Sequence, residues 1–586
     1  MLRPSTSFIP DHRGLLDGRC TVKRQIVLLS FAAFSTSCAQ LFAATNAPTF
    51  NRDIAPILFR QCAECHHAGA IAPFSLTNFR EAKKRAKLIA DVTRSRYMPP
   101  WPPEPGYGEF AGARHLSDLE IETIERWSRT GAKEGAARDL PAAPSWPDGW
   151  QLGTPDLVLT PPKAFDLPAE GPDIYRNFVL PNAATAEHFV RAVEFQPGTN
   201  GAIHHAFLLI DETGDARRLE SLETQPGFPG MLAGRGARAP GGFVSWQPGR
   251  RPVESPEGMA WPLRKGADLV LQLHLRPTGK REKIQPRIGL HFTDQAPTRP
   301  YMLMLLRSTS IDIAPGASDY AFESSYQLPV DVSVVGIAPH LHLLGKEARG
   351  WAELPDGGRV ELIFIKQWDF NWQGEYRYVQ PVALPKGTTL KMRFTYDNSE
   401  KNERNPNHPP RRVQYGIETA DEMGELWFWL ETKTAAELAT LEREHFGTYG
   451  LRDKVAVNEA LVRRDPKDAS SRTELGVGLA AMGKTQEAIT QLRQAATDDP
   501  KAQRTFYALG TLLAKIGELG EAESALTRAT EIDPRDGKAQ CNLGMVLLNS
   551  GKAAQAVERF EAALQVTPND ALARQGLEKA RAQSGK

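Results

Sequence analysis

A period of 34 residues near the C-terminus constrains the fold more than any other feature of this 586-residue chain. Small residues at fixed points of such a period allow two helices per repeat to pack closely, and each repeat buries its apolar face only against its neighbours. The sequence therefore predicts a stack of helix pairs, and Pro466 extends the register back into a partial unit. The recurring residues are Leu475, Leu509 and Leu543, each followed by Gly; Gly483, Gly517 and Gly551; Ala488, Ala522 and Ala556; and Pro500, Pro534 and Pro568.

This spacing is similar to that of the tetratricopeptide repeat. We expect such repeats over residues 469–586, preceded by a helical connector over residues 436–468. Arrays of this type generally present a groove to a partner peptide, so the sequence predicts a protein partner for this region. The alternative is that the array only caps or dimerises the rest of the chain.

The N-terminal residues 1–44 have the pattern of a signal peptide and leader. Lys23 and Arg24 precede the short apolar segment "QIVLLSFAAF", and small residues follow it. The segment is shorter than the roughly 20 apolar residues of a membrane span, so we expect no transmembrane span in the mature chain. Cleavage after Ala39 and lipid attachment at Cys38 are both open. We therefore expect a periplasmic or otherwise exported protein.

Composition excludes some partner classes and isolates one motif. The chain has 71 Lys+Arg and 70 Asp+Glu, which gives no electrostatic reason to expect a nucleic acid or an anionic membrane as partner. At roughly 150 residues per domain, the length suggests about four units. An exported protein with only five cysteines uses almost none for disulfides, so the pair in "CAECH" needs another role.

The "CAECH" motif predicts a covalently attached haem c. Both thiols, Cys62 and Cys65, would add to the haem vinyl groups, and His66 would become the proximal iron ligand. A redox dithiol or half of a zinc site are the alternatives. No second cysteine pair is present to complete a zinc site, and the adjacent histidine favours haem.

The surrounding residues 46–135 resemble small cytochrome c domains and predict an all-α haem domain. Met98, in the proline-stiffened "SRYMPPWPP", is the expected distal ligand, with a packing role as the alternative and His67 as the other candidate. Ser117 and Glu120 predict a capping box at the start of a closing helix. That helix should bury its apolar positions. These positions are Leu119, Ile121, Ile124 and Trp127.

After a Pro-rich linker over residues 136–154, the sequence predicts antiparallel β-structure. Runs such as "ADLVLQLHLRPTG", "DVSVVGIAPHLHLLG" and "GELWFWLET" are broken by Gly and Pro loops, with no long helical period between them. We expect two jelly-roll-like β-sandwiches, over residues 155–298 and 299–435, divided near residues 296–300.

Histidines in these runs form two candidate metal sites. Adjacent strand residues face opposite ways, so His204 and His205 can share a metal only where the backbone is distorted or at a strand end, and Gly201 favours a distortion. Gln272 and His274 share one strand face, which suits hydrogen-bond support of a ligand.

The second candidate site consists of His340, His342 and Met423. The two histidines are two residues apart and therefore co-facial, and the methionine follows an acidic turn. Two imidazoles with a thioether form a soft ligand set that suits copper better than zinc or non-haem iron. Taken singly, each histidine has an ordinary alternative as a surface or satisfied core residue.

Residues 155–432 resemble the ascorbate-dependent type II copper monooxygenases, represented by the peptidylglycine alpha-hydroxylating and dopamine beta-hydroxylating enzymes. The resemblance rests on "VEFQPGTNGAIHHAFLL", "LVLQLHL", "PHLHLLGK", "TYDNSEKN" and "ETADEM". It implies an electron-storing copper site at His204, His205 and His274 with Gln272 beside it. It also implies a catalytic copper site at His340, His342 and Met423.

The resemblance implies that the chain hydroxylates a C–H bond of a small organic substrate with dioxygen. Electrons would come from the fused haem, and an external reductant such as ascorbate or another redox partner remains open. This chain has Ala338 and Trp427 at the positions where the peptide-amidating members hold a peptide carboxylate. It also has Gly424 where animal members of the family have a cysteine. A C-terminal peptide substrate is therefore not expected. The alternative function is a non-catalytic electron-transfer or copper-binding scaffold that docks partners through its repeats.

Overall fold

The computed structural model describes residues 47–586, except residues 69, 71, 148, 182–185, 199–200, 231–244, 247–251, 253 and 586. The expected signal peptide and Cys38 lie outside the described residues. All the elements described below belong to the unit Pro48–Lys586. Within the described ranges, no helix combines the length and the apolar character needed to cross a bilayer.

The first part of the chain is helical, and its closing helix has the expected cap. Ser117 Oγ accepts from the backbone N–H of Glu120, and the Glu120 carboxylate accepts from the backbone N–H of Ser117, which completes the capping box. Trp127 is fully buried on this helix, whereas Leu119 is 71% exposed, so its expected burial is wrong. The elements are η1 (Phe50–Ile54), α1 (Ala55–Gln61), α2 (Phe79–Lys84), α3 (Ala86–Arg94), α4 (Asp118–Arg129) and η2 (Ala137–Asp139).

Two β-sheets follow and share one core, which we call the first sandwich. Their orders are β1-β11-β4-β8 and β6-β3-β9-β5-β7, and all their strand pairs are antiparallel. Phe195 and Leu290 of one sheet belong to the same buried cluster as Leu208 and Leu271 of the other. A separate two-stranded sheet pairs β10 with β2. The strands of this region are β1 (Leu157–Leu159), β2 (Phe165–Leu167), β3 (Ile174–Leu180), β4 (His188–Gln196), β5 (Ile203–Asp211), β6 (Phe228–Pro229), β7 (Ser245–Trp246), β8 (Trp261–Leu263), β9 (Asp268–Leu275), β10 (Glu282–Ile284) and β11 (Arg287–Thr293), with helix α5 (Asp215–Ser221) after β5.

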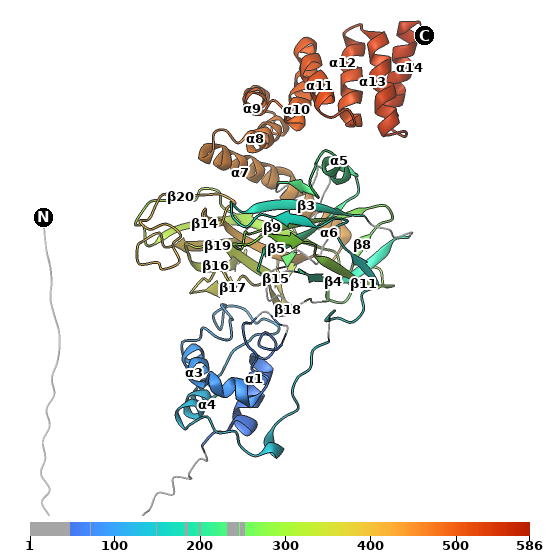
Figure 1. Cartoon of the computed structure of the whole chain (residues 1–586). Helices are drawn as coiled ribbons and strands as arrows, with labels where there is room; N and C mark the ends of the chain where they lie inside the picture. Colours follow the sequence, from blue (N-terminus) through green and yellow to red (C-terminus); the bar gives the residue numbers. More distant parts are fainter. Residues whose placement is uncertain are drawn as a thin grey trace, which may run out of the picture. The chain divides into compact units, whose positions relative to one another are not determined.

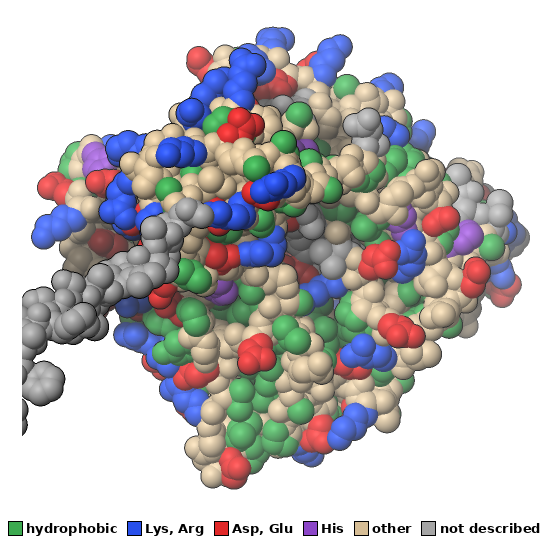
Figure 2. Space-filling model, turned by 90° about the horizontal axis from the view of Figure 1, so that it is seen from below, with side chains coloured by type: hydrophobic (Ala, Val, Ile, Leu, Met, Phe, Trp, Pro, Cys, Tyr) green, Lys and Arg blue, Asp and Glu red, His purple; other side chains and the backbone are tan. Residues whose placement is uncertain are grey.

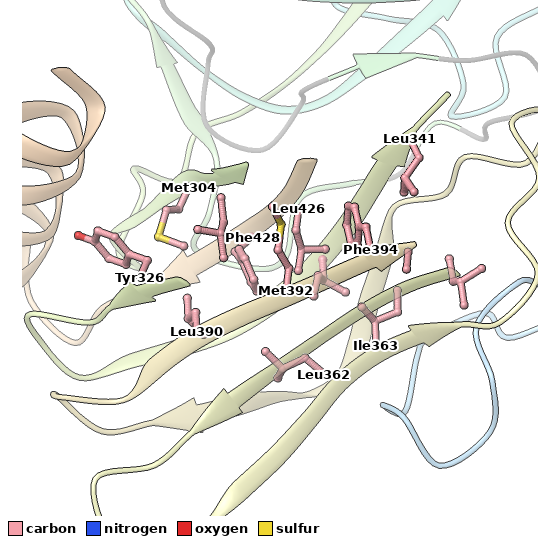
Figure 3. Packing of buried hydrophobic residues seen from close by; sticks show 14 of the residues in the cluster. Met304, Tyr326, Leu341, Leu362, Ile363, Leu390, Met392, Phe394, Leu426 and Phe428 are labelled. Carbon is pink, nitrogen blue, oxygen red and sulfur yellow. The ribbon is translucent and has the colours of Figure 1, made fainter. Parts of the chain in front are cut away.

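A second pair of sheets, the second sandwich, has the orders β12-β21-β15-β18 and β14-β19-β16-β17. Leu426 and Phe428 from the first of these sheets pack against Leu390, Met392 and Phe394 from the other (Figure 3). A separate two-stranded sheet pairs β13 with β20. The strands of this region are β12 (Tyr301–Arg307), β13 (Asp312–Ile313), β14 (Tyr320–Gln327), β15 (Val332–Leu341), β16 (Gly345–Glu353), β17 (Arg359–Ile365), β18 (Tyr376–Leu384), β19 (Thr389–Tyr396), β20 (Val413–Gln414) and β21 (Gly424–Glu431).

The C-terminal part is a succession of antiparallel helix pairs (Figure 1). Gly483, Gly517 and Gly551 end the first helix of successive pairs with positive φ angles of 79°, 87° and 76°, a conformation that side chains disfavour. A Cβ at Gly510 would lie 2.6 Å from Leu526, so the leucine–glycine pairs mark close helix contacts. The helices are α6 (Ala435–Glu444), η3 (His445–Tyr449), α7 (Gly450–Arg464), α8 (Ala469–Ala481), α9 (Thr485–Asp498), α10 (Gln503–Lys515), α11 (Leu519–Ile532), α12 (Gly537–Asn549), α13 (Ala553–Val566) and α14 (Ala571–Ser584).

Helix α7 belongs to two hydrophobic cores at once. Ala460 is buried in the core of the second sandwich, and Val457 and Leu461 pack against that core. Val455, on another face of the helix, is buried in the core of the repeats. The expected connector is therefore a packed helix that joins the second sandwich to the array.

Charges of both signs are scattered over the surface. Figure 2 shows acidic and basic side chains interspersed on one face of the molecule, with no face-wide excess of either sign. This agrees with the balanced composition of the sequence.

Candidate metal centres

Three imidazoles converge where β5 and β9 pair. The register places His205 opposite His274 and shifts between Ile203 and His205, so His204 is the extra residue of a β-bulge. Gly201, just upstream, has a φ of 92°. The distortion expected from the sequence is present, and it turns two adjacent histidines toward the same place.

The ring nitrogens of this cluster have the spacing of metal ligands. The Nδ1 atoms of His204 and His205 are 3.3 Å apart, and those of His205 and His274 are 3.4 Å apart. Two nitrogens bound to one tetrahedral ion at about 2.0–2.1 Å would lie roughly 3.3–3.4 Å from each other. In the described part of the chain, these three residues form the one group of three or more His, Cys, Asp or Glu side chains whose ligand atoms all lie within 4.8 Å of one another.

Asp173, which the sequence did not single out, holds the third imidazole. Its Oδ2 lies 2.8 Å from Nε2 of His274, so the ring donates its Nε2–H there and keeps the Nδ1 lone pair free for the cluster. Thr419 donates to the same oxygen at 2.8 Å. Tyr175 stacks on His274, with centroids 4.4 Å apart, and donates to the Ile417 carbonyl at 2.9 Å.

Gln272 shares the strand face of His274 but has a different partner. Its Nε2 donates to Oδ1 of Asn177 at 2.9 Å, and Asn177 donates in turn to the Gly230 carbonyl at 2.8 Å. The structure therefore places this amide in a buried network with β3. Its expected role beside a metal remains a prediction.

Burial favours the neutral imidazole at His204 and His205. Desolvation lowers the pKa of His204 to about 4, with the neighbouring His274 and His340 adding to the effect. Burial also lowers the pKa of His205 well below its ordinary value. A neutral imidazole is the form that binds a metal.

His340 and His342 lie at the end of β15, with ring centroids 5.1 Å apart. Nδ1 of His340 is hydrogen-bonded to Oε1 of Gln373, and Nδ1 of His342 is 3.0 Å from the Asp421 carbonyl. Both partners are oxygen acceptors, so both rings carry the proton on Nδ1 and have a free lone pair on Nε2.

Glu422 fixes the turn that follows this pair. Its carboxylate accepts from the backbone N–H of His342 at 2.9 Å and of Leu344 at 2.6 Å. The carboxyl group is fully buried. Burial raises its pKa to about 8, although the backbone hydrogen bonds oppose this shift.

Met423 follows Glu422 and directly precedes β21. The register Leu341↔Gly424 between β15 and β21 brings the backbone of Met423 next to that of His342. The methionine is 8% exposed, and its carbonyl accepts from Tyr396 Oη at 2.8 Å. A Cβ at Gly424 would lie 2.1 Å from the ring of Phe322, which explains why a side chain is excluded directly after Met423.

Phe370 touches both histidine clusters. Its ring stacks on His204 with centroids 4.9 Å apart, and it meets His342 edge-on at 5.8 Å. The one signal for this residue in the sequence is its place in the aromatic segment "WDFNWQGEY". The two clusters therefore share one aromatic neighbour.

The cysteine motif lies at the end of α1. His66 Nδ1 is 3.0 Å from the Phe74 carbonyl, which leaves Nε2 free as an axial ligand requires. His67 instead stacks on Trp146 at 3.8 Å, and its Nδ1 contacts the Ala63 carbonyl. Burial raises the pKa of the Cys62 thiol to about 12. Cys65 is half-buried, and neither Cys62 nor Cys65 forms a disulfide.

Met98 begins a segment that reaches the second sandwich. Its backbone N–H donates to the Val92 carbonyl at 3.1 Å, and its side chain is half-buried. Further along, Glu104 donates to the Phe364 carbonyl of β17 at 2.7 Å. Phe110 pairs with Tyr378 of β18 and enters the core of the second sandwich. The segment thus covers one edge strand from each sheet of that sandwich.

Comparison with known proteins bears on the helical array. Tetratricopeptide-repeat family models match residues 479–543 and 537–570. Residues 479–570 are tetratricopeptide repeats. Two crystal structures of MamA are similar to 24% of the chain at 24% identity, with 82% and 78% of the MamA chains covered and a TM-score of 0.23 for both. No curated protein matches the chain.

Proposed function

We propose that this protein is an exported copper-dependent monooxygenase that hydroxylates a C–H bond of a small organic substrate with dioxygen. The observation that carries the proposal is the three-nitrogen cluster of His204, His205 and His274, lying across Phe370 from His342. The β-bulge at His204 brings three imidazole nitrogens within metal-binding distance of one another, and this arrangement supports a metal site.

The donor sets fit two copper ions of different character. His204, His205 and His274 would hold one ion through Nδ1, and Asp173 would orient the third ring. His340 and His342 would hold the other through Nε2, together with the soft thioether of Met423. Copper at these positions would supply one-electron redox chemistry and dioxygen reduction.

The chain's own residues prepare the sites for that chemistry. Asp173, Gln373 and the Asp421 carbonyl fix ring orientations, so the lone pairs are in place before a metal arrives. Phe370, which contacts both clusters, and buried Trp368, which donates to the His342 carbonyl, would shield the sites from water. Glu422 prevents the His342 turn from relaxing.

A haem c on Cys62, Cys65 and His66 is the proposed internal electron donor, with Met98 as the distal ligand. The fixed Nδ1–H of His66 and the two unpaired cysteines support this assignment. A donor on the same chain acts at high effective concentration, which suits delivery of one electron at a time. An external reductant such as ascorbate would serve the same purpose. We also propose that the protein is exported, to the periplasm or otherwise.

The test is metal and haem analysis of the purified full chain, followed by turnover in labelled dioxygen. We expect about two copper ions per haem and incorporation of one labelled oxygen into an organic product. Met423→Leu should abolish incorporation while the haem content stays unchanged, because leucine keeps the volume but removes the thioether. A product without label would contradict the monooxygenase assignment.

The repeats favour a second candidate function, the binding of a protein partner. Their presence supports docking of a protein partner, and a non-catalytic electron-transfer or copper-binding scaffold would use the same surface. Copper and haem bound in the expected ratio with no labelled product from any substrate screened would favour the scaffold.

A further inference from the structure

The second candidate metal site is linked to the helical array through α7. Besides its shared packing, α7 is tied to the second sandwich by Asp453, which lies 2.7 Å from Arg307 of β12. At its C-terminal end, Arg464 Nη1 lies 2.7 Å from Oδ2 of Asp421, and Nη2 lies 3.3 Å from Glu418. Arg464 is two residues before Pro466, where the repeat register begins.

Both carboxylates belong to residues 416–423, which we call the methionine loop. This loop ends with Met423, and the Asp421 carbonyl fixes the ring of His342. Its Thr419 reaches Asp173 in the first sandwich. The loop therefore contacts His342 directly and reaches the first cluster through Asp173, and Arg464 holds it from the side of the array.

The local geometry is built around this arginine. A Cβ at Gly416 would lie 2.2 Å from Asp421 Oδ2 and 2.8 Å from Arg464 Nη1, so any side chain at residue 416 would displace the ion pair. Asp421 Oδ2 also accepts from the backbone N–H of Glu418 at 3.1 Å. The Asp421 side chain is only 13% exposed, so its charge needs a partner.

We propose that Arg464 is a positioning residue through which α7, and with it the repeat array, fixes the geometry of His342 and Met423. The ligand class at that site rests on the proposed function, whereas the mechanical link does not. Loss of the guanidinium leaves a poorly solvated carboxylate unpaired, and the loop must move to hydrate it. That movement shifts the Asp421 carbonyl, which accepts a hydrogen bond from the His342 ring.

The first test uses the metal-free full chain and hydrogen exchange measured by mass spectrometry. In Arg464→Ala, we expect peptides covering residues 416–423 and 342–344 to exchange about tenfold faster than in the wild type. Arg464→Lys should restore part of the protection, because lysine keeps the charge but cannot fork between two carboxylates. Arg463→Ala, an exposed neighbour on the same helix, is the matched control and should not differ from wild type. Unchanged exchange in Arg464→Ala would overturn the proposal.

The second test measures Cu(I) affinity by competition with a chromophoric chelator. Arg464→Ala should weaken one of two sites by about 10-fold and leave the other within about twofold, as expected for a residue that supports a ligand from outside. Equal weakening of both sites, or of neither, would overturn the positioning role. If the wild type binds no copper, the proposed function fails, while the exchange experiment still decides the link.

The contribution of the array is tested from its own side. Val455→Ala removes contact between α7 and Gly478 of the first repeat, and we expect it to speed exchange in the methionine loop. Leu577→Ala in α14, a similar truncation at the far end of the array, should leave the loop at the wild-type rate. A loop insensitive to Val455→Ala would overturn the coupling to the repeats.

Discussion

Asp173 offers the sharpest test of the first candidate site, because one carboxylate oxygen serves two partners. In Asp173→Ala, Nε2 of His274 loses an acceptor at 2.8 Å and Thr419 loses one at the same distance. The ring is then free to rotate or to change its tautomer. A change of tautomer would move the proton to Nδ1, the nitrogen needed for a metal.

The expected loss of metal affinity follows from these contacts. Hydrogen bonds to a charged group contribute about 1.5–3 kcal/mol each, and Asp173 is partly solvated, so we take the lower end for the bond to His274. About 1.4 kcal/mol corresponds to tenfold in affinity, within the roughly 10–100-fold loss expected for removal of such an outer partner. Asp173→Asn keeps an acceptor oxygen without the charge and should fall between alanine and wild type.

The assay is the same competition titration for Cu(I) on the full chain. We expect Asp173→Ala to weaken one of two sites by 10-fold or more, according to the range above. Thr419→Val removes the loop's donor but keeps the His274 contact, so the first-site affinity should stay within about threefold of wild type. Asp166→Ala, an exposed carboxylate on β2, is the control. If Asp173→Ala left both affinities at wild-type values, the role assigned to Asp173 would be refuted.

Three further outcomes are expected. Met98→Ala should keep covalent haem but lower its reduction potential, on the order of 0.1 V, in a redox titration, whereas His67→Ala should not change it. Burial lowers the pKa of His445 to about 4, below its ordinary value of about 6.5, so protonation favours the unfolded chain. The free energy of unfolding should therefore be highest above pH 6.5 and fall as the pH drops to about 4. In denaturant titrations, His445→Gln should make this fall smaller by on the order of 2–3 kcal/mol. Phe560→Ala should destabilise the repeats by about 3–5 kcal/mol in denaturation followed by helical circular dichroism, while the exposed Phe446→Ala should have little effect.

The local features of the chain were readable from the sequence, because they depend on residues close together along it. The 34-residue period predicted the repeats that the family models confirm over residues 479–570. Ser117 and Glu120 predicted a capping box, which the structure has. The need for a distorted strand at His204 followed from the alternation of strand side chains, and the bulge is there.

Tertiary packing decided which side chains support the histidines. Asp173 is 101 residues from His274 and 246 residues from Thr419, so no local pattern could join them. Phe370 and Arg464 reach the same region from other elements. Leu119 follows the apolar spacing of α4, but within the described ranges no element covers it, and it is 71% exposed. Periodicity reports the face of one element, whereas contacts depend on which other element covers that face, and only the folded chain determines this.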